Sequence, residues 1–278
     1  MTSSQVHRRG RKATTSPRGP TAEQALNAAG RAGYVARGVV YVLIGVLALR
    51  IAFGRGSGPA DRQGALHEVA AQPFGTVMLW LLVVGFACMA VWRFSQAALA
   101  KGPHHKAGAR LLDGVKALLY TAICWATAAY AAGSGGTSSG DAQSQDGTAT
   151  AMTYSGGRIL VGVAACVLIG VGAMLAVQAV RRRFLRQLDT GAMSPRTREV
   201  VTALGVAGGA ARGAVYAAVG AFMLVAAVRF DPHQAKGMDA TLRSFAHTPV
   251  GPLLLVAVAV GLVLFGGSSF ASARWGRL

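Results

Sequence analysis

Six long runs of apolar residues, separated by polar segments, dominate the chain. They cover roughly 35–53, 74–94, 114–132, 158–180, 208–228 and 250–271. An α-helix needs about 20 apolar residues to cross the hydrocarbon core of a bilayer. The runs lack the alternation of apolar and polar positions that a transmembrane β-strand requires. The pattern therefore predicts an all-α membrane protein with six transmembrane helices.

The opening of the first run recurs later in the chain. Residues 36–41 read Ala-Arg-Gly-Val-Val-Tyr, and residues 211–216 read Ala-Arg-Gly-Ala-Val-Tyr. A diverged copy lies between them, with Lys116 and Tyr120 at the positions of the arginine and the tyrosine. The approach to the second helix repeats as well, because Pro73-x-Gly75 returns as Pro249-x-Gly251. Internal repeats of this kind indicate one supersecondary unit used several times.

The repeats divide the chain into a tail and three units. We predict a basic, largely disordered cytoplasmic tail over 1–30 and two-helix units over 31–100, 107–188 and 200–278. A unit with two spans returns the chain to the side where it began, so the three units have the same orientation. Parallel repeats are related by an axis along the membrane normal. The expected arrangement is therefore pseudo-three-fold.

These repeated motifs resemble a known bacterial membrane family, catalogued as domain of unknown function 1206. The resemblance rests on the Arg-Gly-x-x-Tyr opening and on the Pro-x-Gly before the second helix. The middle unit departs from it, with Lys116-Ala117 in place of Arg-Gly and no proline before Gly157. The resemblance implies the fold and the membrane placement. It implies no activity, because the family itself is uncharacterised.

Composition agrees with a helical membrane protein. Charged residues make up 14% of the chain, and there are 37 glycines. Soluble domains carry about 25% charged residues. Small residues let helix backbones approach closely in lipid. Pairs four residues apart, such as Gly209 and Gly213, therefore predict close helix contacts.

The net charge of +18 is distributed unevenly along the chain. Most arginines and lysines precede the first run, follow the last, or lie between runs two and three or four and five. The other connections hold few cations. This alternation is the positive-inside rule. It places both termini in the cytoplasm of a multi-pass protein of the inner (plasma) membrane, and it explains the charge without a nucleic-acid partner.

Three basic residues each precede a tyrosine by four positions, so the two side chains share a helix face. The pairs are Arg37 with Tyr41, Lys116 with Tyr120, and Arg212 with Tyr216. One interpretation is a ring of cations that binds an anion, either a lipid phosphate or a solute. The other is that each cation extends to the lipid head groups while its tyrosine anchors in the interface. The shallow position of the pairs favours the second interpretation.

Other polar residues near the spans have simpler expected roles. Arg93, flanked by Trp92 and Phe94, is typical of an interfacial anchor. Gln96 and Gln178 occupy matched positions and are expected to hydrogen-bond between helices. Asp113 lies three residues before Lys116 and is expected to form an ion pair with it.

The pattern of acidic residues argues against several functions. All ten lie in loops or at helix ends, whereas coupled transporters commonly hold a carboxylate within a span. The sequence shows no catalytic, cofactor-binding or metal-binding constellation. The glycine- and serine-rich stretch 133–140, within the long 133–157 loop, is expected to be a flexible linker.

The leading hypothesis is a non-enzymatic structural or accessory membrane component. Its expected partners are membrane lipids with anionic head groups on the cytoplasmic side, or another membrane protein. The alternative is a channel or permease for a small anionic or neutral solute through the pseudo-three-fold centre, with Arg37, Lys116 and Arg212 at its mouth. The direction in which these three side chains point distinguishes the two hypotheses.

Overall fold

The structure is helical throughout the described part of the chain. The computed structural model describes residues 22–54, 59–99, 107–134, 140–154, 156–246 and 251–276. Six long helices carry the predicted spans: α1 (Ala22–Ala52), α3 (Gly75–Leu99), α4 (Ala107–Ala131), α6 (Gly157–Val180), α7 (Pro195–Arg229) and α9 (Gly251–Trp275). All six are long and apolar enough to cross a membrane. The prediction of six transmembrane helices in three repeats is therefore confirmed.

Large apolar side chains cover the outer surface of these helices. Leu81 on α3, Trp125 on α4 and Ile159 on α6 are 66%, 77% and 72% exposed. Soluble proteins rarely leave so extended an apolar surface uncovered. Lipid, rather than water, is the solvent that suits this surface, and the protein is a multi-pass membrane protein.

Three spanning helices, α1, α4 and α7, begin several residues before their apolar runs. α1 starts at Ala22, so residues 22–30 of the predicted tail are helical, and residues 1–21 lie outside the described part. α7 starts at Pro195, where the hydroxyl oxygen of Ser194 accepts a hydrogen bond from the backbone N–H of Thr197 at 3.2 Å. This cap satisfies one of the N–H groups that a helix start leaves unpaired.

A short helix connects the two spanning helices of each unit. These connectors are α2 (Arg62–Ala70), α5 (Gly140–Met152) and α8 (Met238–Ala246). α5 occupies 13 residues of the segment 133–157, which the sequence predicts to be a loop, and most of the predicted flexible linker over 133–140 lies outside the described part. Asp141 stands in the first turn of α5, where a carboxylate interacts favourably with the free N–H groups.

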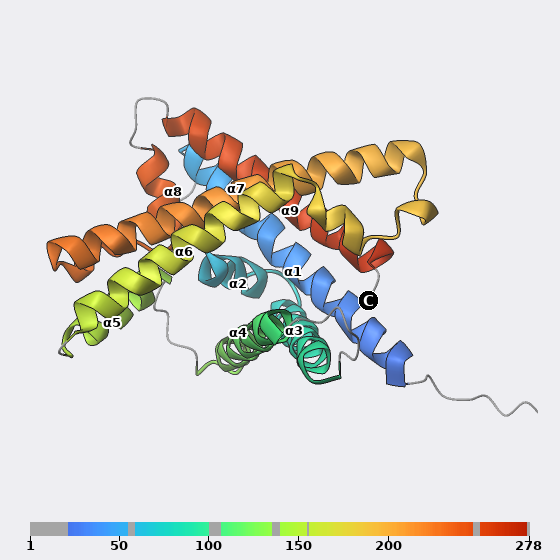
Figure 1. Cartoon of the computed structure of the whole chain (residues 1–278), viewed down its shortest axis with the longest axis horizontal. Helices are drawn as coiled ribbons and strands as arrows, with labels where there is room; N and C mark the ends of the chain where they lie inside the picture. Colours follow the sequence, from blue (N-terminus) through green and yellow to red (C-terminus); the bar gives the residue numbers. More distant parts are fainter. Residues whose placement is uncertain are drawn as a thin grey trace, which may run out of the picture.

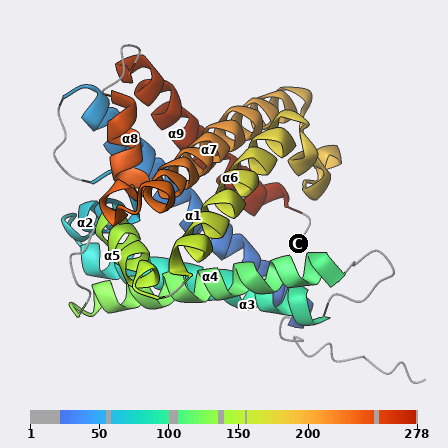
Figure 2. The same ribbon diagram turned by 60° about the vertical axis from the view of Figure 1, so that its left-hand side comes forward.

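The spanning helices associate mainly between neighbouring units. The second helix of each unit packs along the first helix of another, giving the pairs α3–α4, α6–α7 and α9–α1. The two helices of each pair run side by side, and the three pairs cross one another steeply (Figures 1 and 2). α1 also packs on α3 and α7 on α9, whereas α4 and α6 of the middle unit do not pack on each other. Because the middle unit departs in this way, the pseudo-three-fold arrangement is not confirmed.

Small residues bring α6 and α7 together, as the spacing of Gly209 and Gly213 predicts. A Cβ atom on Gly213 would lie 2.6 Å from the carbonyl oxygen of Gly172, and one on Gly209 would lie 2.6 Å from the Cβ of Ala179. Neither glycine has room for a larger side chain. The close contacts lie within one chain.

The main apolar core lies among α1, α3, α7 and α9, beneath the connectors. It contains Val40 and Ile44 of α1, Leu82 of α3, Val215 of α7 and Leu262 of α9. The connectors also contribute to it: a leucine of α2 and the matched leucine of α8, Leu66 and Leu242, are fully buried. The repeated leucines are therefore packing residues.

Candidate anion-binding cavity

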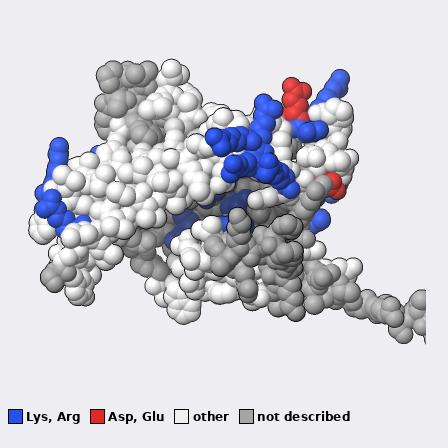
Figure 3. Space-filling view, viewed as in Figure 1, with Lys and Arg blue, Asp and Glu red and all other residues white. Residues whose placement is uncertain are grey.

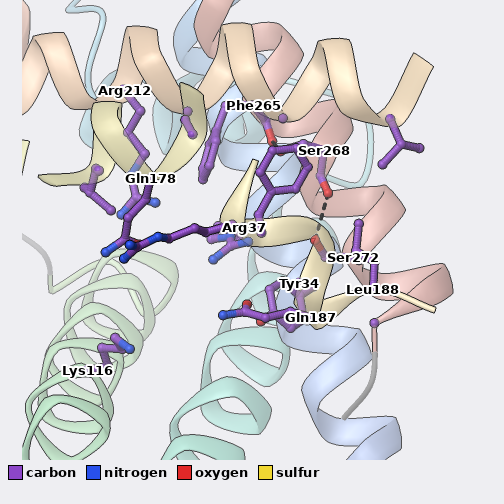
Figure 4. Close-up of a pocket in the computed structure, with 18 of the residues that line it drawn as sticks. Tyr34, Arg37, Lys116, Gln178, Gln187, Leu188, Arg212, Phe265, Ser268 and Ser272 are labelled. Carbon is purple, nitrogen blue, oxygen red and sulfur yellow. Dashed lines mark hydrogen bonds between the residues drawn. The ribbon is translucent and has the colours of Figure 1, made fainter. Parts of the chain in front are cut away.

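A cavity of about 540 Å³ lies among the six spanning helices. It is next to the short 3-10 helix η1 (Arg183–Gln187), which follows α6 on the side that the sequence predicts to be cytoplasmic. Its basic lining residues are Arg37, Arg93, Lys116, Arg183 and Arg212, and its acidic lining residue is Asp113. All three repeated cations therefore contribute to one cavity (Figure 4).

The surface around the cavity is also basic. Exposed arginines gather over η1 and the start of α7, with further basic side chains visible in the hollow beneath them (Figure 3). These exposed residues are Arg181, Arg182, Arg183, Arg186, Arg196 and Arg198. Together with the cavity they form a positive field that concentrates anions near its mouth.

Arg37 is held by α1 against aromatic rings and one hydroxyl group. Its Nε donates a hydrogen bond to the Oγ of Ser269 at 3.2 Å. Its guanidinium carbon lies 4.6 Å from the ring centre of Tyr34 and 5.3 Å from that of Phe265. Cation–π contacts of this kind orient an arginine without neutralising its charge.

Arg212 occupies the corresponding position on α7 and shares the ring of Phe265. Its guanidinium carbon lies 4.7 Å from the ring centre of Phe265 and 5.1 Å from that of Tyr216. Its Nε is buried without a hydrogen-bond partner among the described residues. The described residues also include no carboxylate paired with Arg37 or Arg212.

Lys116, the third repeated cation, has a carboxylate partner. Its Nζ lies 3.0 Å from Oδ1 of Asp113, which confirms the predicted ion pair. The same oxygen lies 3.1 Å from a terminal nitrogen of Arg93. One carboxylate thus faces two cations, and the cavity retains an excess of positive charge.

Arg93 differs from its predicted role. Its side chain is 14% exposed, lines the cavity and stacks on Trp92 with the guanidinium carbon 4.4 Å from the ring centre. It is therefore not an anchor that extends into the lipid interface. The expectation that the repeated cations extend outward is likewise wrong for Arg37 and Arg212, which face the cavity. Gln96 and Gln178 also line it.

The repeated tyrosines lie between the cavity and the apolar core. The hydroxyl oxygens of Tyr41 and Tyr216 are 3.0 Å apart, and the ring of Tyr41 packs edge-on against Phe265 at 4.7 Å. Tyr120 stacks on Phe86, with ring centres 6.5 Å apart. Tyr41 and Tyr120 both pack against the main core. Of the aromatic residues in this group, Phe265 lines the cavity, and Tyr41 packs behind it.

A second polar cluster lies at the opposite ends of the spans, among the connectors. Asp61 accepts a hydrogen bond from the N–H of Gly140 at 2.8 Å, and Asp141 accepts one from Ala240 at 2.9 Å. Asp239 accepts one from the N–H of Ala60 at 2.7 Å, so the third unit is joined back to the first. We call these three aspartates the aspartate clasp. Each joins its own unit to another.

The sequence by itself does not reveal the aspartate clasp, because its members lie in segments that the pattern predicts to be loops or helix ends. The available signal was their spacing: positions 61, 141 and 239 differ by nearly the repeat interval. Burial raises the pKa of Asp141, and the carboxylates of Asp239 and Asp61 raise it further, while the N–H of Ala240 opposes the shift. Burial likewise lowers the pKa of the neighbouring Arg62.

Comparisons with known proteins find relatives of unknown activity. A family described as "Domain of Unknown Function (DUF1206)" matches residues 32–100, 114–182 and 207–276. The chain is also 30% identical over 241 residues to "Uncharacterized protein YxxB" of Bacillus subtilis (strain 168). That match covers 85% of this chain and 86% of the relative. No solved structure matches the chain.

Proposed function

Because the chain belongs to the family described as Domain of Unknown Function 1206, whose description names no activity, we propose its function from the cavity. The protein is a non-enzymatic membrane component that binds an anionic group in the cavity from the cytoplasmic side. The observation that carries this proposal is the pairing of Arg37 and Arg212 with Phe265, in a cavity where neither has a carboxylate partner among the described residues.

Electrostatics supports an anionic ligand. Partly buried cations are costly to leave without a counter-charge. The cavity holds five basic side chains and one carboxylate, Asp113. Arginine donates from a planar fork that suits phosphate and carboxylate oxygens. An entering anion therefore neutralises charge that the described protein residues leave uncompensated.

The placement of this cavity on the cytoplasmic side rests on the distribution of charge. The arginines around η1 and the start of α7 lie on the same side as the cavity (Figure 3). By the positive-inside rule, such a segment faces the cytoplasm. The proposal therefore includes an inner-membrane location with both termini cytoplasmic.

The competing function is a channel or permease for a small anion. Convergence of the repeated cations favours it, because rings of cations select anions in pores. The Tyr41–Tyr216 hydrogen bond and the ring of Phe265 weigh against an open pore in this conformation. Anion flux in liposomes tests it: Arg37→Ala combined with Arg212→Ala reduces the flux if the ring lines a pore. Equal flux through the wild type and this double variant removes the alternative.

Binding to the purified protein tests the proposal itself. We expect both sn-glycerol 3-phosphate and dioleoyl phosphatidic acid to raise the thermal unfolding midpoint in neutral detergent, with a dependence on concentration that gives an apparent Kd. Arg37→Gln and Arg212→Gln are each expected to weaken both ligands about tenfold or more, because a hydrogen bond to a charged group contributes roughly 1.5–3 kcal/mol.

The control for this measurement is Arg196→Gln. Arg196 is exposed on the same side of the protein and does not line the cavity. It is expected to leave the apparent Kd within about twofold of wild type, since it contributes only a long-range field. If neither cavity substitution weakens binding more than this control does, the cavity is not the anion site.

A further inference from the structure

We infer that the anionic group is the phosphate head of a membrane lipid, whose acyl chains leave the cavity between α4 and α6. This inference rests on the proposed function and names its ligand. A free phosphate presents the same oxygens to Arg37 and Arg212, so the residues beside the cations must distinguish the two ligands. On one side, the cavity lies between two helices, α4 and α6, that carry exposed apolar side chains.

The first observation is the separation of α4 and α6. Asp113 and Lys116 of α4 line the cavity on one side, and Leu175 and Gln178 of α6 line it on another. These two helices do not pack on each other. In the first and third units, by contrast, the two spanning helices do pack together, α1 on α3 and α7 on α9. Within the described part of the chain, these two helices therefore form no packed interface on this side of the cavity.

The second observation is the order of polar and apolar residues along this opening. On α4, Leu119 follows Lys116 by one turn toward the membrane centre and is 58% exposed. On α6, Val171 precedes Gln178 by two turns in the same direction and is 40% exposed. Both helices thus present a polar group at the cavity and apolar side chains deeper in the bilayer.

This gradient matches a lipid of the cytoplasmic leaflet. Its phosphate lies at the level of the cations, and its chains extend toward the bilayer centre past the exposed apolar residues. A cavity of about 540 Å³ also falls in the range of pockets that hold whole small molecules, rather than a single inorganic ion. Charge and apolar complementarity therefore select an amphiphile with an anionic head.

The test separates the head group from the chains. Apparent Kd values are measured, by the thermal unfolding midpoint in neutral detergent, for dioleoyl phosphatidic acid and for sn-glycerol 3-phosphate. We expect the lipid to bind about 100-fold or more tightly, because burial of its chains adds to the contacts of the head group. Dioleoyl phosphatidylcholine, which has the same chains and no net charge, is expected to bind at least about tenfold more weakly than the acid.

A substitution on α6 then tests the route of the chains. Leu175→Trp places a bulky side chain on the cavity wall without changing any charge. It is expected to weaken phosphatidic acid about tenfold and to leave glycerol 3-phosphate unchanged. The matched control is Val177→Trp, because Val177 is 48% exposed at a similar depth on α6 and does not line the cavity.

The outcomes distinguish the two proposals. If glycerol 3-phosphate binds as tightly as phosphatidic acid and Leu175→Trp changes neither, the lipid inference is overturned while the anion site stands. If neither Arg37→Gln nor Arg212→Gln weakens either ligand more than Arg196→Gln does, the proposed function itself fails. Should Leu175→Trp not fold, a chain-length series of phosphatidic acids on the wild type decides: affinity that does not rise with chain length, relative to matched phosphatidylcholines, overturns the inference.

Discussion

The hydroxyl oxygens of Tyr41 and Tyr216 lie 3.0 Å apart, although 175 residues separate them in the chain. The two tyrosines hold equivalent positions in the first and third units. Their meeting brings Arg37 and Arg212, one turn earlier on each helix, close to the ring of Phe265 in the same cavity. Because the motif is repeated, its copies supply several side chains to the same site.

The tyrosine pair is expected to be energetically coupled. Tyr41→Phe and Tyr216→Phe each keep the ring and remove one hydroxyl group. In a double-mutant cycle, the coupling should be about 0.5–1.5 kcal/mol, the usual contribution of one hydrogen bond. Unfolding in mixed detergent micelles measures it. Strictly additive effects of the two substitutions would mean that this hydrogen bond contributes nothing.

The glycine contact between α6 and α7 is expected to be intolerant of larger residues. Gly213→Val should destabilise the protein by about 1–3 kcal/mol, because a Cβ there would meet the backbone of Gly172 and force the helices apart. The control is Gly170→Ala on α6, since a Cβ there meets no atom within 4 Å. Equal unfolding free energies for both variants would contradict the close packing.

The aspartate clasp is expected to stabilise the connectors. Asp61 caps α2 through the N–H of Gly64 at 2.9 Å and also accepts from Gly140. Asp61→Ala leaves two N–H groups without this partner, and it should cost about 1–3 kcal/mol in unfolding free energy. Asp146→Ala, at an exposed position on α5, is the control and should change little. A similar loss in both variants would argue against the clasp.

The pKa of Asp141 predicts a specific dependence on pH. Burial raises this pKa, so the folded protein holds the proton more tightly than the unfolded chain does. The corresponding stability is present at low pH and is lost as the pH rises through the raised pKa. Asp141→Asn removes the buried charge and keeps an oxygen that accepts the N–H of Ala240. It should raise the unfolding midpoint at about pH 8 and lose this advantage near pH 4.

Cysteine labelling tests the proposed orientation in the membrane. In a variant with Cys88, Cys124 and Cys166 replaced by alanine, single cysteines are placed at two exposed positions, Gln72 and Arg196. An impermeant maleimide should label Gln72→Cys in intact spheroplasts, and Arg196→Cys only after permeabilisation, as the positive-inside rule requires. The reverse pattern would place the cavity on the outer side.

Two features, the helix α5 and the position of Arg93, could not be predicted from the sequence, for identifiable reasons. The helix α5 contains two glycines and three threonines or serines, which are poor helix formers, so its residues resemble a linker. Its first turn is fixed by contacts with α2 and α8, through Asp61 and Asp141. Arg93 was misassigned because its aromatic neighbours suit an interface equally well, and its partner Asp113 is on another helix.

The sequence alone determined the six spans, the three repeats and the pairing of each cation with a tyrosine. These are local properties, because the length of an apolar run and the spacing of residues on one helix need no knowledge of its neighbours. The tertiary structure decided which way the cations face. That direction depends on the rotation of each helix about its own axis, which contacts between distant segments set, such as those of Gly213 with Gly172 and of Arg37 with Phe265.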